Sequence, residues 1–456
     1  MKNYDVIVIG SGCGALISDE AAAHGLKTAL IDKGPLIGGT CLNWGCIPSK
    51  MLIFPADRIV EMQEAAKLGV TAGIKSIDFH AIMERMRQSR EQSQVHIRES
   101  IGKTKNLDFY EGEAHFVADY TLEVNSERLR GEKIFIASGS RLLIPPIKGL
   151  EDIDYLTNES VLELKERPDS LIIIGGGYVA VEYCHFFAAM GTKVTILEMA
   201  DRLVLSEEPE IAELLKKKLS QRMEVHTGAQ AEEVKRSNSG ISVITRDKST
   251  GREREFQAQS MMIAVGRRST ADLLKVENTG VELDSRGFIE TNNRLETSKK
   301  YIFAVGDVNG KQMFTHMANR EAAIAAHNAF HDASLEVDYD VVPHAVYSYP
   351  QIASVGLREE DAKKDHEIIV GRTKYSDIAK GEAMMERDGF AKAIVEKDTD
   401  KILGFHIIGP YAPVLIQEVV NAMTSGGGID ELNQGIHIHP ALSELIPTTV
   451  NSVGES

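Results

Sequence analysis

The sequence predicts an α/β fold in which two similar α/β domains are followed by a smaller C-terminal α+β domain. The pattern of strand, glycine-rich turn, helix and strand occurs twice, beginning near Val6 and again near Leu171. From about Val341 the pattern changes to strands and a helix, and no glycine-rich turn recurs. The length of 456 residues is also enough for about three domains of average size.

The composition is that of an ordinary globular protein, with 43% hydrophobic and 26% charged residues. Asp and Glu number 67 against 51 Lys and Arg, which gives a net charge of −16. This charge repels nucleic acids and anionic membrane surfaces, so we expect neither as a partner. No run approaches about 18 apolar residues, and no signal or transit peptide precedes the first strand, so we expect a cytoplasmic protein.

The first repeat has the pattern of a dinucleotide-binding, Rossmann-like unit. An apolar strand over 6–9 leads through a turn with Gly10, Gly12 and Gly14 into an alanine-rich helix, and a second strand ends at Asp32. The glycines allow a tight turn and a close approach to a pyrophosphate, which the helix N-terminus attracts. The acidic residue that ends the second strand binds ribose hydroxyls.

The second repeat has the same order, with a glycine-rich turn at 175–177 and an acidic residue, Glu198, at the end of its second strand. Glu198 would repel a 2'-phosphate and the next two residues offer no cation, which favours NAD over NADP, although Arg202 leaves NADP open. Two nucleotide sites indicate one bound redox cofactor and one that diffuses. We expect FAD at the first repeat, which lies next to a cysteine pair, and NAD at the second.

The remaining elements complete these domains. We expect a polar helix over 85–102, a hairpin strand over 116–124 and a linker near 143–149. A strand over 301–305 ends at Gly306-Asp307, where Asp307 is placed to accept hydrogen bonds from a ribityl chain, and helices are expected over 319–330 and 412–424. The expected division is an FAD domain at 1–145, an NAD domain at 146–267, a segment completing the FAD lobe at 268–340 and an interface domain at 341–456.

Two of the four cysteines, Cys41 and Cys46, lie five positions apart in a glycine-rich segment. Pro48 suits the first turn of a helix, so Cys46 is expected at a helix N-terminus, where the dipole stabilises a thiolate. Lys50 adds positive charge one turn later. A zinc site would need two more soft ligands, and the other cysteines lie inside the nucleotide-binding units, so we expect no metal. The segment favours a redox-active disulfide over two buried thiols.

With this segment the chain resembles the flavoprotein disulfide reductases, and most closely the dihydrolipoamide dehydrogenases. The resemblance continues through 137–141, 178–182, 264–267, 354–357, 403–410 and 437–444. It implies that Cys46 faces the flavin, that Cys41 exchanges with the substrate, and that Lys50 and Glu182 lie near flavin N5. The residues expected to bind FAD are Gly10, Gly12, Gly14, Asp32, Lys33, Gly39, Thr40, Lys50, Ala114, Asp307 and Thr315. Those expected to bind NAD are Gly175, Gly176, Gly177, Tyr178, Val179, Glu198 and Gly266.

His439, followed by Pro440 and by Glu444 five residues after the histidine, forms a base with an orienting carboxylate. His437 is the competing candidate, but the proline follows His439. The resemblance makes His439 the catalytic base and implies that it reaches the cysteine pair of the other subunit, so we expect a homodimer.

The expected reaction is oxidation of a protein-bound dihydrolipoyl dithiol through the Cys41–Cys46 disulfide and FAD, with hydride passed to NAD. The expected partner is a lipoyl-bearing carrier protein or lipoyl domain. The alternatives are an NAD(P)H-dependent reductase of another disulfide and a noncatalytic subunit that tethers a lipoyl carrier. Mercuric reductases carry a vicinal cysteine pair near the C-terminus, which this chain lacks, and glutathione reductases have arginine near the position of Glu198. Which lipoyl carrier is used stays open.

Overall fold

The structure is a computed structural model that describes residues 1–237, 240–331 and 333–454. It divides into two compact units, each assembled from three stretches of chain. The first unit contains residues 1–49, 83–143 and 266–338, and the second contains residues 50–82, 144–265 and the chain from 339 onward. Two long helices contribute to both units, α3 (Cys46–Glu64) and α4 (Phe79–Lys103).

A seven-stranded sheet forms the centre of the first unit, in the order β3-β2-β1-β6-β5-β4 with β16 paired to β6. The hairpin of β4 and β5 is antiparallel, and the strands around β1 are parallel. Its strands are β1 (Lys2–Ile9), β2 (Thr28–Asp32), β3 (Leu107–Glu111), β4 (Ala114–Ala118), β5 (Thr121–Val124), β6 (Glu127–Ile136) and β16 (Ile302–Ala304). Val6, Ile7 and Val8 are fully buried, as in parallel strands that are covered on both faces.

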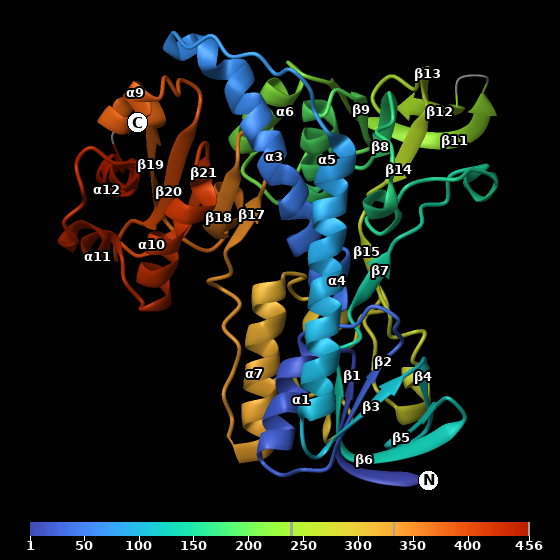
Figure 1. The fold of residues 1–456 in the computed structure, drawn as a ribbon. Coiled ribbons are helices and arrows are strands. Elements are labelled where there is room, and N and C mark those ends of the chain that lie inside the picture. The colour runs from blue at the N-terminus through green and yellow to red at the C-terminus, as the bar shows by residue number, and fades with distance from the viewer. Residues whose placement is uncertain (238–239, 332, 455–456) are drawn as a thin grey trace. The chain divides into compact units, whose positions relative to one another are not determined.

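Helices α1 (Gly14–Ala23) and α7 (Thr315–His331) pack side by side in the first unit (Figure 1). A short helix, α2 (Gly39–Asn43), precedes α3. A small antiparallel sheet joins β7 (Ser140–Leu142) to β15 (Arg267–Ser269). These connections bring residues from the three stretches of the unit around one end of the central sheet.

The second unit holds a four-stranded parallel sheet, in the order β10-β9-β8-β14, and a three-stranded antiparallel sheet of β11, β12 and β13. The strands are β8 (Ser170–Ile174), β9 (Lys193–Glu198), β10 (Glu224–Thr227), β11 (Ala229–Ser237), β12 (Gly240–Asp247), β13 (Glu253–Ala258) and β14 (Ser260–Ile263). The helices of this part are α5 (Tyr178–Ala189) and α6 (Pro209–Leu219).

The C-terminal part of the second unit is built on a five-stranded antiparallel sheet, in the order β17-β18-β21-β20-β19. Helices α10 and α12 pack on this sheet and share its hydrophobic core. The strands are β17 (His344–Val346), β18 (Ile352–Gly356), β19 (Ile368–Lys374), β20 (Phe390–Glu396) and β21 (Ile402–Ile408). The helices are α8 (Glu359–Ala362), α9 (Ala379–Ala383), α10 (Ala412–Thr424), α11 (Ile429–Gln434) and α12 (Leu445–Asn451).

This topology confirms the predicted fold class of two Rossmann-like sheets and a C-terminal α+β part. The helix over 412–424 has the predicted bounds. Helix α4 begins at Phe79, six residues before the predicted start, where Asp78 Oδ1 accepts a hydrogen bond from Ala81 N–H at 2.9 Å and caps the first turn. The predicted four-segment division stays a prediction.

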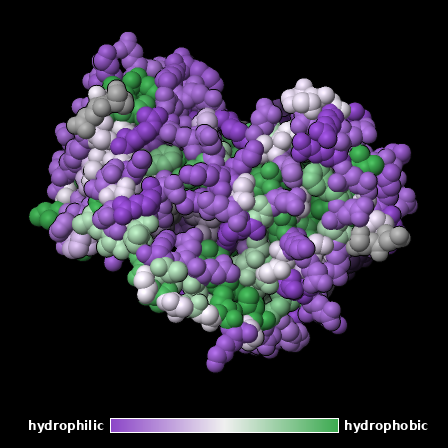
Figure 2. Space-filling view, turned by 90° about the horizontal axis from the view of Figure 1, so that it is seen from above, coloured by the Kyte–Doolittle hydropathy of each residue, from purple (hydrophilic) through white to green (hydrophobic). Residues whose placement is uncertain are grey.

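The face of the molecule shown in Figure 2 is mainly hydrophilic. Hydrophilic side chains cover most of the face shown in Figure 2, and hydrophobic residues appear on it in smaller groups. Across the part of the chain that the structure describes, no helix combines the length and the apolar character needed to cross a bilayer.

Candidate functional site

The first glycine-rich turn follows β1 and leads into α1. Gly10 has a φ of 102°, and a Cβ there would lie 2.3 Å from the Ala137 carbonyl oxygen, so only glycine fits. Gly14 starts α1 and lies against β1, since its Cβ would approach Val8 Cγ1 at 2.8 Å. The glycine-rich turn at the N-terminus of α1 suits a pyrophosphate.

Asp32 closes β2 beside this turn. Its Oδ2 accepts hydrogen bonds from the backbone N–H and the hydroxyl of Ser11, and its Oδ1 accepts one from Gly34 N–H at 3.1 Å. The carboxylate is therefore held at the glycine-rich turn, where a ribose would lie. Lys33 is exposed next to it.

The cysteine segment lies directly against the first glycine-rich turn. Gly39 has a φ of 75°, and a Cβ there would lie 2.6 Å from Gly12 Cα, so the two loops touch backbone to backbone. Thr40 is in the first turn of α2, and α3 begins at Cys46 with Pro48 in its first turn, as predicted. The fold thus places the redox segment and the nucleotide turn at one site.

The structure holds Cys41 and Cys46 as thiols, the dithiol form of the pair. Cys46 is exposed, Cys41 is half-buried, and Cys46 Sγ lies 3.4 Å from the hydroxyl oxygen of Thr315 at the start of α7. A hydrogen bond with Cys46, followed by burial, raises the pKa of the Cys41 thiol well above its usual value. The raised pKa favours the thiol form of Cys41, and Cys46 is the exposed member of the pair.

A buried amide network that the sequence analysis missed supports the redox segment. Gln94 Nε2, from α4, donates to Asn43 Oδ1 at 2.8 Å and to the Ile37 carbonyl at 2.7 Å. Asn43 Nδ2 donates to the carbonyls of Ile37 and Gly39. Asn43 lies inside the cysteine segment, but no local signal in the sequence marks Gln94.

The expected ribityl-binding residue, Asp307, belongs to a polar chain at the same end of the sheet. Arg267 Nε donates to Ser140 Oγ at 2.6 Å, and Ser140 Oγ donates to Asp307 Oδ2 at 2.6 Å. Asp307 Oδ1 stays available for a ligand hydroxyl. Ala114, at the start of β4, is buried within the same unit. The glycine cradle, Asp32 and Asp307 together fit an extended FAD molecule.

The second glycine-rich turn repeats this arrangement in the second unit. Gly175 has a φ of 118°, and a Cβ there would lie 2.3 Å from the Ala264 carbonyl. A Cβ on Gly176 would lie 2.8 Å from Glu198 Cγ, so the carboxylate side chain flanks the turn. Glu198 Oε1 accepts the Ala200 N–H at 2.6 Å.

The other expected NAD-binding residues lie around the start of α5, with one exception. Gly177 is the residue before α5, Tyr178 is exposed in its first turn and Val179 is half-buried. Gly266 belongs to the first unit, where its carbonyl accepts the Leu143 N–H at 3.0 Å.

Lys50 and Glu182 form an ion pair within the second unit. Lys50 Nζ lies 2.6 Å from Glu182 Oε2, and the Glu182 side chain is only 7% exposed. Tyr347 completes this group, because its backbone N–H donates to Glu182 Oε1 at 3.1 Å and its ring centroid lies 4.5 Å from Lys50 Nζ. The sequence analysis had placed Lys50 and Glu182 together but had no signal for Tyr347.

His439 and Glu444 also form a pair. His439 Nδ1 donates to Glu444 Oε1 at 2.8 Å, and Ala441 N–H donates to Glu444 Oε2 at 3.0 Å. The hydrogen bond from His439, then that from Ala441, lowers the pKa of Glu444. With Nδ1 as donor to a carboxylate, Nε2 keeps a lone pair that can take a proton. The His439 side chain is 72% exposed. His437, the other candidate for the base, has its Nε2 hydrogen-bonded to Glu418 Oε1.

Comparisons with known proteins place the whole chain in one family. Residues 4–322 match the pyridine nucleotide-disulphide oxidoreductase family, and residues 342–450 match the dimerisation domain of pyridine nucleotide-disulphide oxidoreductases. The chain is similar to mycothione reductase of Mycobacterium tuberculosis, with 34% identity over 98% of both chains. It is equally similar to dihydrolipoyl dehydrogenase of Bacillus subtilis, with 34% identity over 97% of this chain and 96% of that protein.

A mercuric reductase of Staphylococcus aureus is 30% identical over 97% of this chain and 81% of that protein. Among solved structures, the Cu(II) complex of the HOCl-induced flavoprotein disulfide reductase RclA from Escherichia coli matches with a TM-score of 0.88 and 28% identity over 99% of both chains. The names of these relatives differ in substrate, and all of them describe oxidoreductases. The chain therefore belongs to the pyridine nucleotide-disulphide oxidoreductases, FAD-containing and NAD(P)H-dependent enzymes, and it carries the dimerisation domain of their homodimers.

Proposed function

We propose that the chain is an NAD-dependent dihydrolipoyl dehydrogenase that oxidises the dithiol of a lipoyl-bearing carrier protein or domain. Glu198 carries this proposal. Its carboxylate flanks the second glycine-rich turn, where it would accept hydrogen bonds from a ribose and repel the 2'-phosphate of NADP. NAD is then the hydride acceptor that dithiol oxidation requires. The similarity to the Bacillus subtilis dihydrolipoyl dehydrogenase supports the same choice.

The proposed exchange starts from a disulfide between Cys41 and Cys46. A substrate thiolate attacks Cys41 Sγ, so a substrate–Cys41 bond forms while the Cys41–Cys46 bond breaks and Cys46 leaves as a thiolate. The second substrate thiolate then attacks the substrate sulfur bound to Cys41. This attack closes the substrate disulfide and releases Cys41, which leaves the dithiol form that the structure holds.

Each substrate thiol loses a proton: His439 is the proposed acceptor of the first, and the Cys41 thiolate released at the end of the exchange takes the second. Glu444 holds Nδ1 protonated, so Nε2 takes the proton and the carboxylate stabilises the imidazolium that forms. The side chain is 72% exposed, which supports action on the cysteine pair of the other subunit in a homodimer.

When bound, FAD accepts the two electrons of the dithiol and delivers hydride to the nicotinamide. Thr315 places a hydroxyl 3.4 Å from Cys46 Sγ, where it can donate to the thiolate. We assign the glycine-rich turns, Asp32 and Asp307 to binding and orienting the cofactors. The Lys50–Glu182 pair is assigned to the reacting end of the flavin.

An anaerobic titration tests the proposal. Dihydrolipoamide and NADH should each reduce the flavin, and dihydrolipoamide should fail with Cys46→Ser. His439→Gln should lower dihydrolipoamide oxidation by about 100-fold or more, as loss of a general base does, and should leave NADH-driven dye reduction nearly unchanged. His437→Gln is the matched control and should retain activity. If dihydrolipoamide does not reduce the wild-type flavin, the substrate assignment is wrong and the family assignment stands.

A second candidate is an NADPH-dependent reductase of another disulfide. Arg202 and Lys248 line a surface cavity of about 690 Å³ that also includes Met199 and Ala200, just beyond Glu198. These cations could hold a 2'-phosphate. The ratio of kcat/KM for NADPH and NADH decides: a preference for NADPH that Arg202→Met abolishes would favour this candidate.

A further inference from the structure

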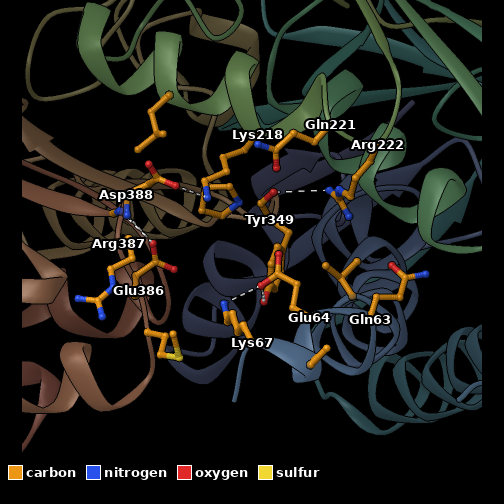
Figure 3. Close-up of a pocket in the computed structure, with 16 residues that line it drawn as sticks. Gln63, Glu64, Lys67, Lys218, Gln221, Arg222, Tyr349, Glu386, Arg387 and Asp388 are labelled. Atoms are coloured by element: carbon orange, nitrogen blue, oxygen red, sulfur yellow. Dashed lines mark hydrogen bonds and ion pairs between the residues drawn. The ribbon is translucent and has the colours of Figure 1, made fainter. Parts of the chain in front are cut away.

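A cavity of about 550 Å³ lies within the second unit, and no residue of the proposed chemistry lines it. Its walls come from the end of α3, the end of α6 with the turn that follows it, the Tyr349–Pro350 segment and the loop 385–389 (Figure 3). Its volume is in the range of small-molecule sites.

The cavity is lined by both signs of charge, and most of the cations have a carboxylate partner. Lys67 Nζ lies 2.9 Å from Glu64, and Lys218 Nζ lies 2.6 Å from Asp388. Arg387 is paired with Glu382. Glu386, also in the wall, accepts the backbone N–H groups of Asp388 and Gly389. Arg222 is the fourth lining cation, and its hydrogen-bond partners differ from those of the other three.

The Arg222 guanidinium is held by neutral acceptors. Both of its terminal nitrogens lie 3.3 Å from His185 Nδ1, and one lies 3.5 Å from the Tyr349 carbonyl oxygen. Within the described residues, no carboxylate oxygen lies within 4.0 Å of it. Burial lowers the pKa of Arg222, and it is the largest influence on that group. The negative charges of Glu64 and Asp57 only partly offset this burial, and an oxyanion in direct contact would offset more of it.

The guanidinium is also fixed in place. His185 is fully buried, and since Nδ1 accepts from Arg222, its Nε2 must donate to Asp57 Oδ1, which lies 2.8 Å away. The Tyr349 ring stacks on His185 and lies 5.8 Å from Arg222 Cζ. A planar donor held by a neutral histidine and an aromatic ring is prearranged to donate to an oxyanion.

We propose that this cavity is a binding site for a small organic anion whose carboxylate or phosphate group is held by Arg222. One of the remaining N–H groups of the guanidinium would donate to an oxygen of the anion. Lys67 and Lys218 at the walls add positive charge, so the titratable lining has four cations against three carboxylates: Lys67, Lys218, Arg222 and Arg387 against Glu64, Glu386 and Asp388.

The test uses calorimetric titration of the FAD-loaded homodimer with inorganic phosphate and, separately, with malonate, at constant ionic strength set with chloride. The two probes distinguish a phosphate site from a carboxylate site. Arg222→Met should weaken binding of the preferred probe by about tenfold to 100-fold, the range for losing a hydrogen bond to a charged group. Arg252→Met removes an exposed arginine outside the cavity and should leave binding unchanged.

A second variant tests the proposal even if Arg222→Met fails to fold. Ala66→Trp places a bulky side chain on the exposed rim of the cavity and leaves Arg222 and His185 unchanged in sequence, and it should also abolish probe binding. Binding that is equal in wild type and both variants would put the anion elsewhere, for example at a nucleotide turn, and would overturn the proposal. Absence of binding of either probe to wild type would overturn it as well, as would occupation of the cavity by the second subunit of the dimer.

Discussion

Removing either partner of the Lys50–Glu182 ion pair should lower the free energy of unfolding, but by unequal amounts. The Lys50 side chain is 34% exposed and the Glu182 side chain is 7% exposed. Glu182→Gln leaves a lysine that water can still solvate. Lys50→Met leaves a buried carboxylate that keeps the Tyr347 N–H as a donor. Lys50→Met should therefore lower the free energy of unfolding more than Glu182→Gln does.

The magnitudes follow from this asymmetry. Removing one partner of a buried pair costs about 3–5 kcal/mol, and we expect Lys50→Met near the lower end, about 3 kcal/mol, because one backbone donor remains. A charge-assisted hydrogen bond contributes about 1.5–3 kcal/mol, and the partial exposure of Lys50 reduces this to about 1 kcal/mol for Glu182→Gln. The double variant should cost less than Lys50→Met alone, since it leaves no buried charge.

Urea unfolding followed by circular dichroism measures these costs. Both variants and the double variant are compared with wild type at two concentrations of added FAD, because bound cofactor stabilises the folded state by mass action. The difference between Lys50→Met and Glu182→Gln should be about 2 kcal/mol at both concentrations. Equal costs for the two single variants, or a double variant that costs the sum of both, would refute the reasoning.

Three further outcomes are expected. Glu198→Ala should raise the ratio of kcat/KM for NADPH to that for NADH by at least about tenfold, because a carboxylate that repels the 2'-phosphate is removed. Steady-state kinetics with both nucleotides measure this ratio, and an unchanged ratio would contradict the role of Glu198. Thr315→Val should slow alkylation of the reduced enzyme by iodoacetamide at neutral pH by about threefold or more, since the hydroxyl near Cys46 Sγ no longer stabilises a thiolate. Equal alkylation rates for the variant and wild type would show that Thr315 does not stabilise the thiolate. Burial lowers the pKa of His185 from its ordinary 6.5, so below that pH the unfolded state binds one more proton than the folded state. The free energy of unfolding should therefore fall by up to about 1.4 kcal/mol per pH unit as pH drops. Urea unfolding of His185→Gln should lack this component, and parallel pH curves for both proteins would count against it.

Local patterns in the sequence were enough to predict the elements and motifs that depend on neighbouring residues. Both glycine-rich turns follow their predicted strands, because the tight positive-φ turn at Gly10 and Gly175 requires glycine. Pro48 correctly predicted the start of α3 at Cys46. Helix α7, however, starts at Thr315, four residues before the predicted start, and its first turn adds Met317 and Ala318 to the buried face.

The resemblance to a family extended the prediction to a pair that is far apart in the chain, Lys50 with Glu182. Their assigned roles stay predictions until the variants are measured. The positions of these residues within the units come from the structure, because a side chain that is a hundred residues away leaves no periodic signal.

The sequence was sufficient for the fold class, the two dinucleotide-binding turns and the cysteine segment, because each rests on spacing within a few residues. Only the tertiary structure showed the Gln94 amides beneath Asn43, the Thr315 hydroxyl beside Cys46, and Arg222 held by His185 at a cavity. The physical reason is that these contacts join residues 37 to 269 positions apart, and such pairings form only when packed helices and strands bring their side chains together.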